Sequence, residues 1–301
     1  MKGALRKGFR MNDDTRNLDE HTRFLMEAHA RHPGLTEHSI GAARTPDGLT
    51  SYEAFSRFAD PRPGMTVVDL ACGNGPLCEI LAERVGSSGC VIGVDLSDDE
   101  LKLAGERLSG YSNIRLLKES AAKLSLSDAS ADLVVCHMAF MLFTPLAQTV
   151  REIGRVLKPG GTFAAVVPTL RKPTELFCAC GATLRSVLQS ERHALGALSG
   201  NEVPMKSAAD LGRIFSNGGW KTESIASCMI DVSIADDPGT LAKRITPAFY
   251  HYQLLSPGGK RRVDSEWLRL FEKACDPSGM VRFHFPLSAF SIQRFGSGEA
   301  L

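Results

Sequence analysis

The feature of this sequence that most restricts its fold is an alternation of short apolar runs with helical periods between residues 66 and 167. Between the runs, apolar side chains recur every three or four positions, as they do on one face of a helix. Strands that alternate with helices form βαβ units, whose strands run parallel in one sheet. The pattern therefore predicts an α/β fold, with strands expected at residues 66–70, 91–94, 114–117, 133–137 and 162–167.

Beyond residue 168 the rhythm is less regular. Apolar runs at 222–232 and 281–292 predict two further strands, and a long segment of helical character separates them. With the helical segment at 18–32, these helical pieces are too dispersed for an independent domain, so we expect them to form a lid over one sheet edge. The expected divisions of the chain are a helical lid segment at 1–50, a ligand-binding core at 51–170, and the remaining core strands with lid insertions at 171–301.

The composition limits the kind of partner. Of the 301 residues, 43% are hydrophobic and 23% are charged, which excludes a disordered, collagen-like or coiled-coil chain. Lys and Arg number 35 against 34 Asp and Glu, so the chain lacks the strong positive field typical of nucleic-acid binding. No apolar run is long enough for a membrane span, the N-terminus lacks a signal-peptide stretch, and the eight cysteines contain no Cys-x-x-Cys pair. We expect a cytoplasmic protein without a metal site that binds neither nucleic acid nor membranes.

The most informative segment is the glycine-rich turn that follows the first expected strand. Gly73 and Gly75 have no Cβ, so a ligand can approach the backbone there. Asp95 follows the second strand, where a carboxylate can accept both hydroxyls of an adenosine ribose. Ser97 and Glu100 then have the spacing of a capping box, which predicts that a helix begins at this point. The two strand ends together indicate an adenosine site.

Asp69 and the absence of a third glycine indicate which kind of nucleoside the site binds. A dinucleotide fingerprint has the form Gly-x-Gly-x-x-Gly, but the position of its third glycine holds Cys78. Asp69, close to the turn, would repel a pyrophosphate, whereas it suits the ammonium of an amino acid, directly or through water. The residues therefore favour a cationic aminoacyl nucleoside over NAD.

Four segments in order resemble the class I S-adenosylmethionine-dependent methyltransferases. Residues 67–75 resemble motif I of this family and residues 91–97 resemble motif II, and segments 117–135 and 151–161, the latter reading REIGRVLKPGG, also match. The likeness is greatest to the small-molecule branch, which includes ubiquinone and menaquinone biosynthesis methyltransferases and natural-product tailoring enzymes. The resemblance implies a Rossmann-like, seven-stranded, mostly parallel sheet with its last strand antiparallel, helices on both faces, and a helical lid.

The same resemblance implies S-adenosylmethionine as the cofactor. Asp95 would hold the ribose, Leu96 would pack on the adenine, and Tyr52 is a candidate for the cofactor carboxylate. Ser120 stands beside Ala121 where the family usually has Asp, which weakens the expected contact with the adenine amino group. The full set of expected cofactor residues is Tyr52, Asp69, Ala71, Cys72, Gly73, Gly75, Asp95, Leu96, Ser120, Ala121 and Cys136.

Candidates for catalysis and acceptor binding follow from position in the chain. His137, at the end of the fourth strand, is the first choice for a general base, because an unperturbed histidine has a pKa of ~6.5; the alternative is a hydrogen-bonded wall residue. Tyr250 and His251 on a lid helix could shape an apolar or aromatic pocket, or merely pack the lid. His284 on the last strand is a third acceptor-binding candidate, although it could face the opposite side of the sheet.

The expected function is methyl transfer from S-adenosylmethionine to a small, apolar or aromatic metabolite through an oxygen, nitrogen or carbon nucleophile. Natural-product biosynthesis is one setting for such an enzyme. An alternative is a cyclase or rearrangement enzyme that keeps the same cofactor without turning it over. A non-catalytic binding protein and an RNA or protein methyltransferase are further alternatives, the last disfavoured by the balanced charge. The N-terminal helix could exchange between subunits, which makes a homodimer conceivable.

Overall fold

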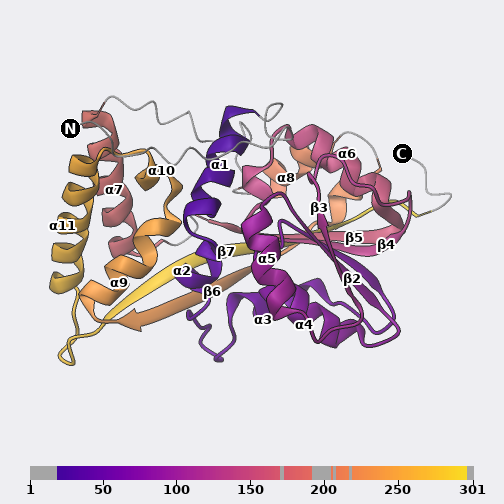
Figure 1. The fold of residues 1–301 in the computed structure, drawn as a ribbon, viewed down its shortest axis with the longest axis horizontal. Coiled ribbons are helices and arrows are strands. Elements are labelled where there is room, and N and C mark those ends of the chain that lie inside the picture. The colour runs from indigo at the N-terminus through magenta and orange to yellow at the C-terminus, as the bar shows by residue number, and fades with distance from the viewer. Residues whose placement is uncertain (1–18, 170–172, 192–204, 206–207, 217–218, 297–301) are drawn as a thin grey trace, which may run out of the picture.

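The computed structural model describes residues 19–169, 173–191, 205, 208–216 and 219–296 (Figure 1). A single mixed sheet runs through this part of the molecule, with the strand order β3-β2-β1-β4-β5-β7-β6. Its strands are β1 (Thr66–Leu70), β2 (Cys90–Asp95), β3 (Ile114–Lys118), β4 (Ala131–His137), β5 (Leu157–Pro168), β6 (Ala226–Asp236) and β7 (Val281–Gln293).

The topology confirms the predicted seven-stranded, Rossmann-like sheet. The neighbours from β3 through β5 pair in parallel, whereas β7 runs antiparallel to both β5 and β6. The described helices are α1 (Glu20–Arg31), α2 (Leu35–Ile40), α3 (Ser51–Ala59), α4 (Pro76–Val85), α5 (Asp98–Arg107), α6 (Leu146–Val156), α7 (Glu175–Ser190), α8 (Ala208–Phe215), α9 (Pro238–Ile245), α10 (Tyr250–Gln253) and α11 (Pro257–Lys273).

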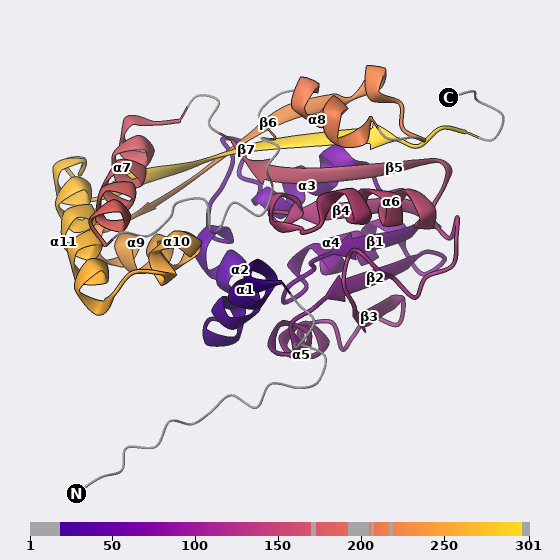
Figure 2. The ribbon, with the colours of Figure 1, turned by 90° about the horizontal axis from the view of Figure 1, so that it is seen from above.

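Helices cover both faces of the sheet, as the alternation along the strands requires. Val67 and Leu133 point toward the side of α3 and α4, whereas Val68 and Val134 point toward the side of α6 and α8. Successive side chains of a strand face opposite ways, so a strand buried on both faces reads as a continuous apolar run. Figure 2 shows the two helical layers on either side of the strands.

The sixth strand differs from the prediction at both ends. We expected residues 222–232, but residues Thr222–Ser224 form a 3-10 turn and β6 occupies Ala226–Asp236. The buried side chains of β6 are Ile230, Val232 and Ile234. The strand pairs with β7 along its whole length, up to the pair of Asp236 with Val281. The bounds of β6 therefore follow from its pairing with β7, which buries every second side chain from Ile230 to Ile234.

Several of the helical pieces outside the core pack together at one end of the sheet. Helices α7, α9 and α11 pack together around the projecting ends of β6 and β7 (Figure 1), and the Trp267 indole of α11 donates to the Cys180 carbonyl of α7 at 3.1 Å. Helix α1 lies beside α5 (Figure 2) and also contacts α10, which in turn contacts α7. Among the described residues, no helix is long and apolar enough to cross a membrane.

Candidate functional site

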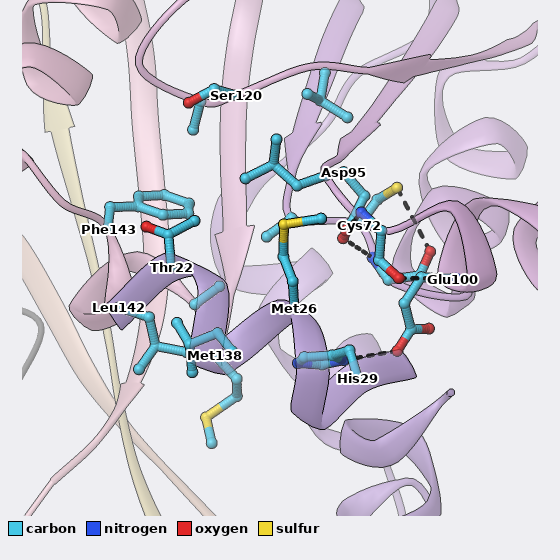
Figure 3. Close-up of a pocket in the computed structure, with 18 of the residues that line it drawn as sticks. Thr22, Met26, His29, Cys72, Asp95, Glu100, Ser120, Met138, Leu142 and Phe143 are labelled. Carbon is cyan, nitrogen blue, oxygen red and sulfur yellow. Dashed lines mark hydrogen bonds and ion pairs between the residues drawn. The ribbon is translucent and has the colours of Figure 1, made fainter. Parts of the chain in front are cut away.

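A cavity of about 360 Å³ lies at the C-terminal ends of β1, β2 and β4 (Figure 3). Its walls come from the turns after these strands, from one side of α1 and from Tyr250 at the start of α10. The chain order switches direction between β1 and β4, because β2 and β3 lie on one side of β1 and β4 and β5 lie on the other. Open α/β sheets bind ligands at such a switch point, so the cavity is the candidate site.

The turn after β1 forms one wall of the cavity. Ala71 and Gly73 both line it with a positive φ, at +56° and +54°. The Cys72 N–H donates to the Val94 carbonyl at 3.0 Å, which ties the turn to β2. The carboxylate of Asp95 completes the connection by accepting the Gly73 N–H at 2.9 Å. The predicted residues Ala71, Cys72, Gly73 and Asp95 therefore meet in one wall.

Gly75 has a different role from the one expected of it. It does not line the cavity, and a Cβ added there would lie 2.8 Å from the Leu108 Cδ1 atom and 3.3 Å from the Ala104 Cβ atom. Its φ of +84° also belongs to the left-handed region that favours glycine. Gly75 thus allows the turn to pack against α5 rather than admitting a ligand.

Replacing Gly75 should therefore destabilise the fold. We expect Gly75→Ala to lower the free energy of unfolding by about 2 to 4 kcal/mol, from steric overlap plus left-handed strain. Gly160→Ala is the matched control, since Gly160 has a φ of +78° but nothing within 4 Å of the added Cβ. Its loss should be only about 1 to 2 kcal/mol, and denaturant unfolding measures both. Equal losses would remove the packing argument.

Asp69 is a buried carboxylate in the cavity wall. Its Oδ2 atom accepts the Cys78 thiol at 3.3 Å, and its Oδ1 atom is buried without a hydrogen-bond partner. Desolvation, together with the charge of nearby Asp95, raises the pKa of Asp69 to about 7 against the hydrogen bond from Cys78. A cationic group in the cavity would favour the ionised form of this acid.

The far end of the cavity is formed by residues expected near an adenine. Leu96, Ser120 and Ala121 all line it, and Figure 3 shows Ser120 on the turn after β3. The Ser120 hydroxyl accepts the N–H of Ala122 at 3.2 Å, so it already stabilises its own turn. These three residues therefore line the cavity, and their contact with an adenine stays a prediction.

Cys136 is not brought to the cavity. It precedes His137 on β4, and neighbouring side chains of a strand point to opposite faces. Cys136 is fully buried in the core on the side of α6, whereas His137 faces the cavity side. Met138, one position further on, lines the cavity at a φ of +60°. The expected cofactor contact of Cys136 is therefore wrong because of strand parity.

His137 lies in the cavity wall in an environment that disfavours protonation. Its Nε2 atom is 3.1 Å from the Ser51 hydroxyl, and its ring stacks on Tyr52 with 4.1 Å between centroids. Desolvation lowers the pKa of His137 to about 3. A histidine with so low a pKa is a weak proton acceptor. The low pKa and the contacts with Ser51 and Tyr52 therefore favour the alternative role, that of a hydrogen-bonded wall residue. Tyr52 lines the cavity as expected, and burial raises its pKa above the usual value.

The three candidates for acceptor binding do not lie in one place. Tyr250 lines the cavity, whereas His251 and His284 do not. The Nδ1 atom of His284 lies 3.3 Å from the Asp231 carboxylate on the neighbouring strand β6. His251 is half-buried on α10 beside Tyr250. Only Tyr250 is thus in a position to contact a ligand there.

The sequence reasoning missed the contribution of α1. Thr22, Met26 and His29 of this helix line the cavity (Figure 3), and His29 Nδ1 lies 2.7 Å from the Glu100 carboxylate. The expected capping box is only half formed, because the Ser97 hydroxyl accepts the Glu100 N–H while the Glu100 side chain turns to His29 instead. The helix itself was expected at residues 18–32 as part of the lid, but no local signal joins it to α5 or to the cavity.

Comparison with known proteins agrees with this geometry. A model of the methyltransferase domain family matches residues 61–215, just over half of the chain. A demethylmenaquinone methyltransferase of Desulfitobacterium hafniense is 36% identical over 118 residues, or 38% of this chain and 46% of that protein. An arsenite methyltransferase of Aquipseudomonas alcaligenes is 36% identical over 107 residues, or 33% of this chain and 31% of that protein. The chain thus spans less than half the length of these curated relatives.

Solved structures share the fold at low identity. Phosphoethanolamine N-methyltransferase 2 of Haemonchus contortus, in complex with phosphomonomethylethanolamine and S-adenosylhomocysteine, superposes with a TM-score of 0.56 at 17% identity. That likeness covers 92% of this chain and 61% of the other. The [4+2]-cyclase SpnF superposes with a TM-score of 0.52 at 16% identity, covering 91% and 93%. With the family match over residues 61–215, the chain belongs to the methyltransferase domain family, among the class I proteins that use S-adenosylmethionine.

Proposed function

We propose that this protein transfers a methyl group from S-adenosylmethionine to a small apolar or aromatic metabolite. The observation that carries the proposal is one continuous cavity. Acids line it at the ends of β1 and β2, and apolar side chains line it, beside Asp19, Thr22 and Thr144, on α1 and on the turn after β4. The acidic part contains Asp69 and Asp95, and the apolar part contains Met26, Leu142 and Phe143 (Figure 3). Such a division suits a cationic donor beside an uncharged acceptor.

The residues at the acidic end fit the cofactor. Asp95 accepts the N–H groups of Gly73 and Ser97, each at 2.9 Å, and a carboxylate retains further lone pairs for ribose hydroxyls. Asp69 has a buried oxygen without a partner, which suits an ammonium group or a water bound to it. Leu96 and Ala121 offer apolar surface for the adenine. These residues would therefore hold the donor across the ends of β1 and β2.

The apolar end supports the choice of acceptor. Met26 of α1 and Met138 after β4 are unbranched side chains that can adjust to an irregular or planar molecule. Leu142 and Phe143 complete this wall from the turn that follows β4. Asp19, Thr22 and Thr144 also line this part of the cavity. An acceptor carrying several negative charges would lose its hydration beside that acid at a high cost in free energy.

The chemistry requires alignment more than side-chain reactivity. When bound, S-adenosylmethionine supplies a methyl carbon that its sulfonium makes electrophilic. The protein's part is to hold a nucleophile in line with that carbon, which is worth ~7 to 11 kcal/mol of the barrier. The stacked pair of Tyr52 and His137 forms a buried wall for this purpose. Because the pKa of His137 is about 3, an acceptor that ionises easily, such as an acidic phenol, is favoured.

Product analysis with labelled donor tests the proposal. The purified protein is incubated with methyl-labelled S-adenosylmethionine and a panel of phenols and quinols, with phosphorylated alcohols as the contrasting set. We expect labelled product and equimolar S-adenosylhomocysteine from the aromatic set. Product without S-adenosylhomocysteine would instead support the cyclase alternative. Absence of donor binding at saturating concentration would contradict both.

A further inference from the structure

Helix α1 crosses the cavity as a bridge between two parts of the wall. At its N-terminal end, the Asp19 carboxylate accepts the Thr144 hydroxyl at 3.0 Å, and His21 Nε2 lies 3.1 Å from the Leu142 carbonyl. At its C-terminal end, His29 contacts Glu100 of α5. Between these ends the helix presents Thr22, Leu25 and Met26 to the cavity. One helix therefore joins the turn after β4 to the helix after β2.

The contacts at the C-terminal end form a chain of three side chains. Glu100 is 2% exposed, and its Oε1 atom lies 2.7 Å from His29 Nδ1 and accepts the Gly34 N–H at 2.9 Å. A carboxylate only accepts, so Nδ1 carries the proton in this contact. The other ring nitrogen of His29 lies 3.0 Å from the Tyr250 hydroxyl. His29 thus connects α5 with α10, two elements far apart in the sequence.

Polar contacts, rather than apolar burial, hold α1 in place. Ala28 is the single fully buried residue of the helix, although its neighbours line the cavity. Segments with few buried apolar contacts open at low free energy. A charge-assisted hydrogen bond to a buried carboxylate is therefore a large part of what keeps α1 closed. Gly34, with a φ of +73°, follows the helix at the point where the chain turns back.

We infer that α1 is a removable strap over the cavity, and that His29, Glu100 and Tyr250 form the clasp that closes it at the side of α5. His29 is in this respect a positioning residue, because it acts on the ligand through the position of the helix. The inference rests on the proposed binding of the S-adenosyl donor in the cavity. It predicts that donor and product enter and leave as the clasp opens.

The strap is tested by the rates at which S-adenosylhomocysteine binds and leaves, measured by surface plasmon resonance. A gate limits both directions of exchange, so loosening it should accelerate both, whereas damage to a site accelerates only dissociation. We expect both rates to rise about tenfold in His29→Ala and in Glu100→Gln. Tyr250→Phe, which removes one hydroxyl, should give a smaller rise in the same direction. The double variant of His29 and Glu100 should exchange no faster than the faster single variant.

Arg31→Gln is the matched control, because Arg31 lies on the same helix in an exposed ion pair with Glu27 at 3.0 Å. It should leave both rates unchanged. Hydrogen exchange over residues 20–31 of the ligand-free protein supplies a second measurement, and it should be faster in His29→Ala than in the control. Unchanged rates, or faster dissociation alone, would overturn the strap. Wild-type protein that binds no S-adenosylhomocysteine would contradict the proposed function instead, while the exchange measurement still tests the clasp.

Discussion

Asp95→Ala should weaken the binding of S-adenosylmethionine about 100-fold, or roughly 3 kcal/mol. Two losses add in this variant. The proposed ribose hydroxyls lose their acceptor, and the N–H groups of Gly73 and Ser97 lose the carboxylate that holds both turns at the cavity. Because a turn released from its anchor also has to be reordered when the ligand binds, the loss should exceed that of one hydrogen bond. Isothermal titration calorimetry measures the affinity directly.

Two further variants separate anchoring from general damage. Asp95→Asn keeps one acceptor oxygen, so it should retain part of the affinity and lose about tenfold. Asp98→Ala, three positions along, removes a largely exposed carboxylate that pairs with Lys118 at 2.8 Å. This control should bind like the wild type. A folded Asp95→Ala protein with unchanged affinity would remove Asp95 from the site.

The affinity for S-adenosylmethionine should rise with pH through about 7 and then level off. Below this range Asp69 is protonated, since burial raises its pKa to about 7, and a neutral acid attracts an ammonium less than a carboxylate does. We expect about tenfold weaker binding at pH 6 than at pH 8 if the ionised form binds. Asp69→Asn should bind with the weaker affinity at both values. Calorimetry in two buffers would also detect the proton released on binding.

Ionisation of Asp69, which should favour donor binding, should lower the stability of the ligand-free protein. The pKa of Asp69 is higher in the folded state than the usual value of 3.8, so the folded state binds the proton more tightly. Its contribution to stability is present below pH 3.8 and is lost as the pH rises through about 7. Asp69→Asn should therefore be more stable than the wild type at pH 8.5, by about 2 to 4 kcal/mol, with little difference near pH 4.

Unfolding curves at the two pH values measure this difference. Asp99→Asn, an exposed acid in the first turn of α5, is the control and should not change the pH dependence. Equal pH dependence of stability in Asp69→Asn and the wild type would mean that the buried oxygen of Asp69 has a partner in solution.

Local pattern was sufficient to predict the sheet and the two turns, at Gly73 and Asp95, that line the cavity. The strands are short apolar runs bounded by glycine and polar residues, and the turns at Gly73 and Asp95 follow directly from where the strands end. The prediction for Cys136 was wrong because successive residues of a strand face opposite sides of the sheet. The sequence does not show which of the two sides borders the cavity. One position separates a core residue from the cavity wall at His137.

Tertiary contacts determine what the pattern could not. Glu100 has the spacing of a capping residue, but its partner is His29, which is distant in the sequence. Likewise, the low pKa of His137 follows from burial against Tyr52 and Ser51, and neither contact is visible from residue type alone. Both cases depend on contacts between segments that are distant in the sequence, and only the whole fold brings those segments together.

The two ends of the cavity are built in different ways, and this difference has a consequence for engineering. The donor end depends on main-chain turns after β1 and β2, where a substitution disturbs the backbone itself. The proposed acceptor end contains side chains such as Met138 and Phe143, which can be exchanged one at a time. A library confined to these positions could therefore redirect the enzyme to new compounds while its affinity for the methyl donor serves as a constant reference.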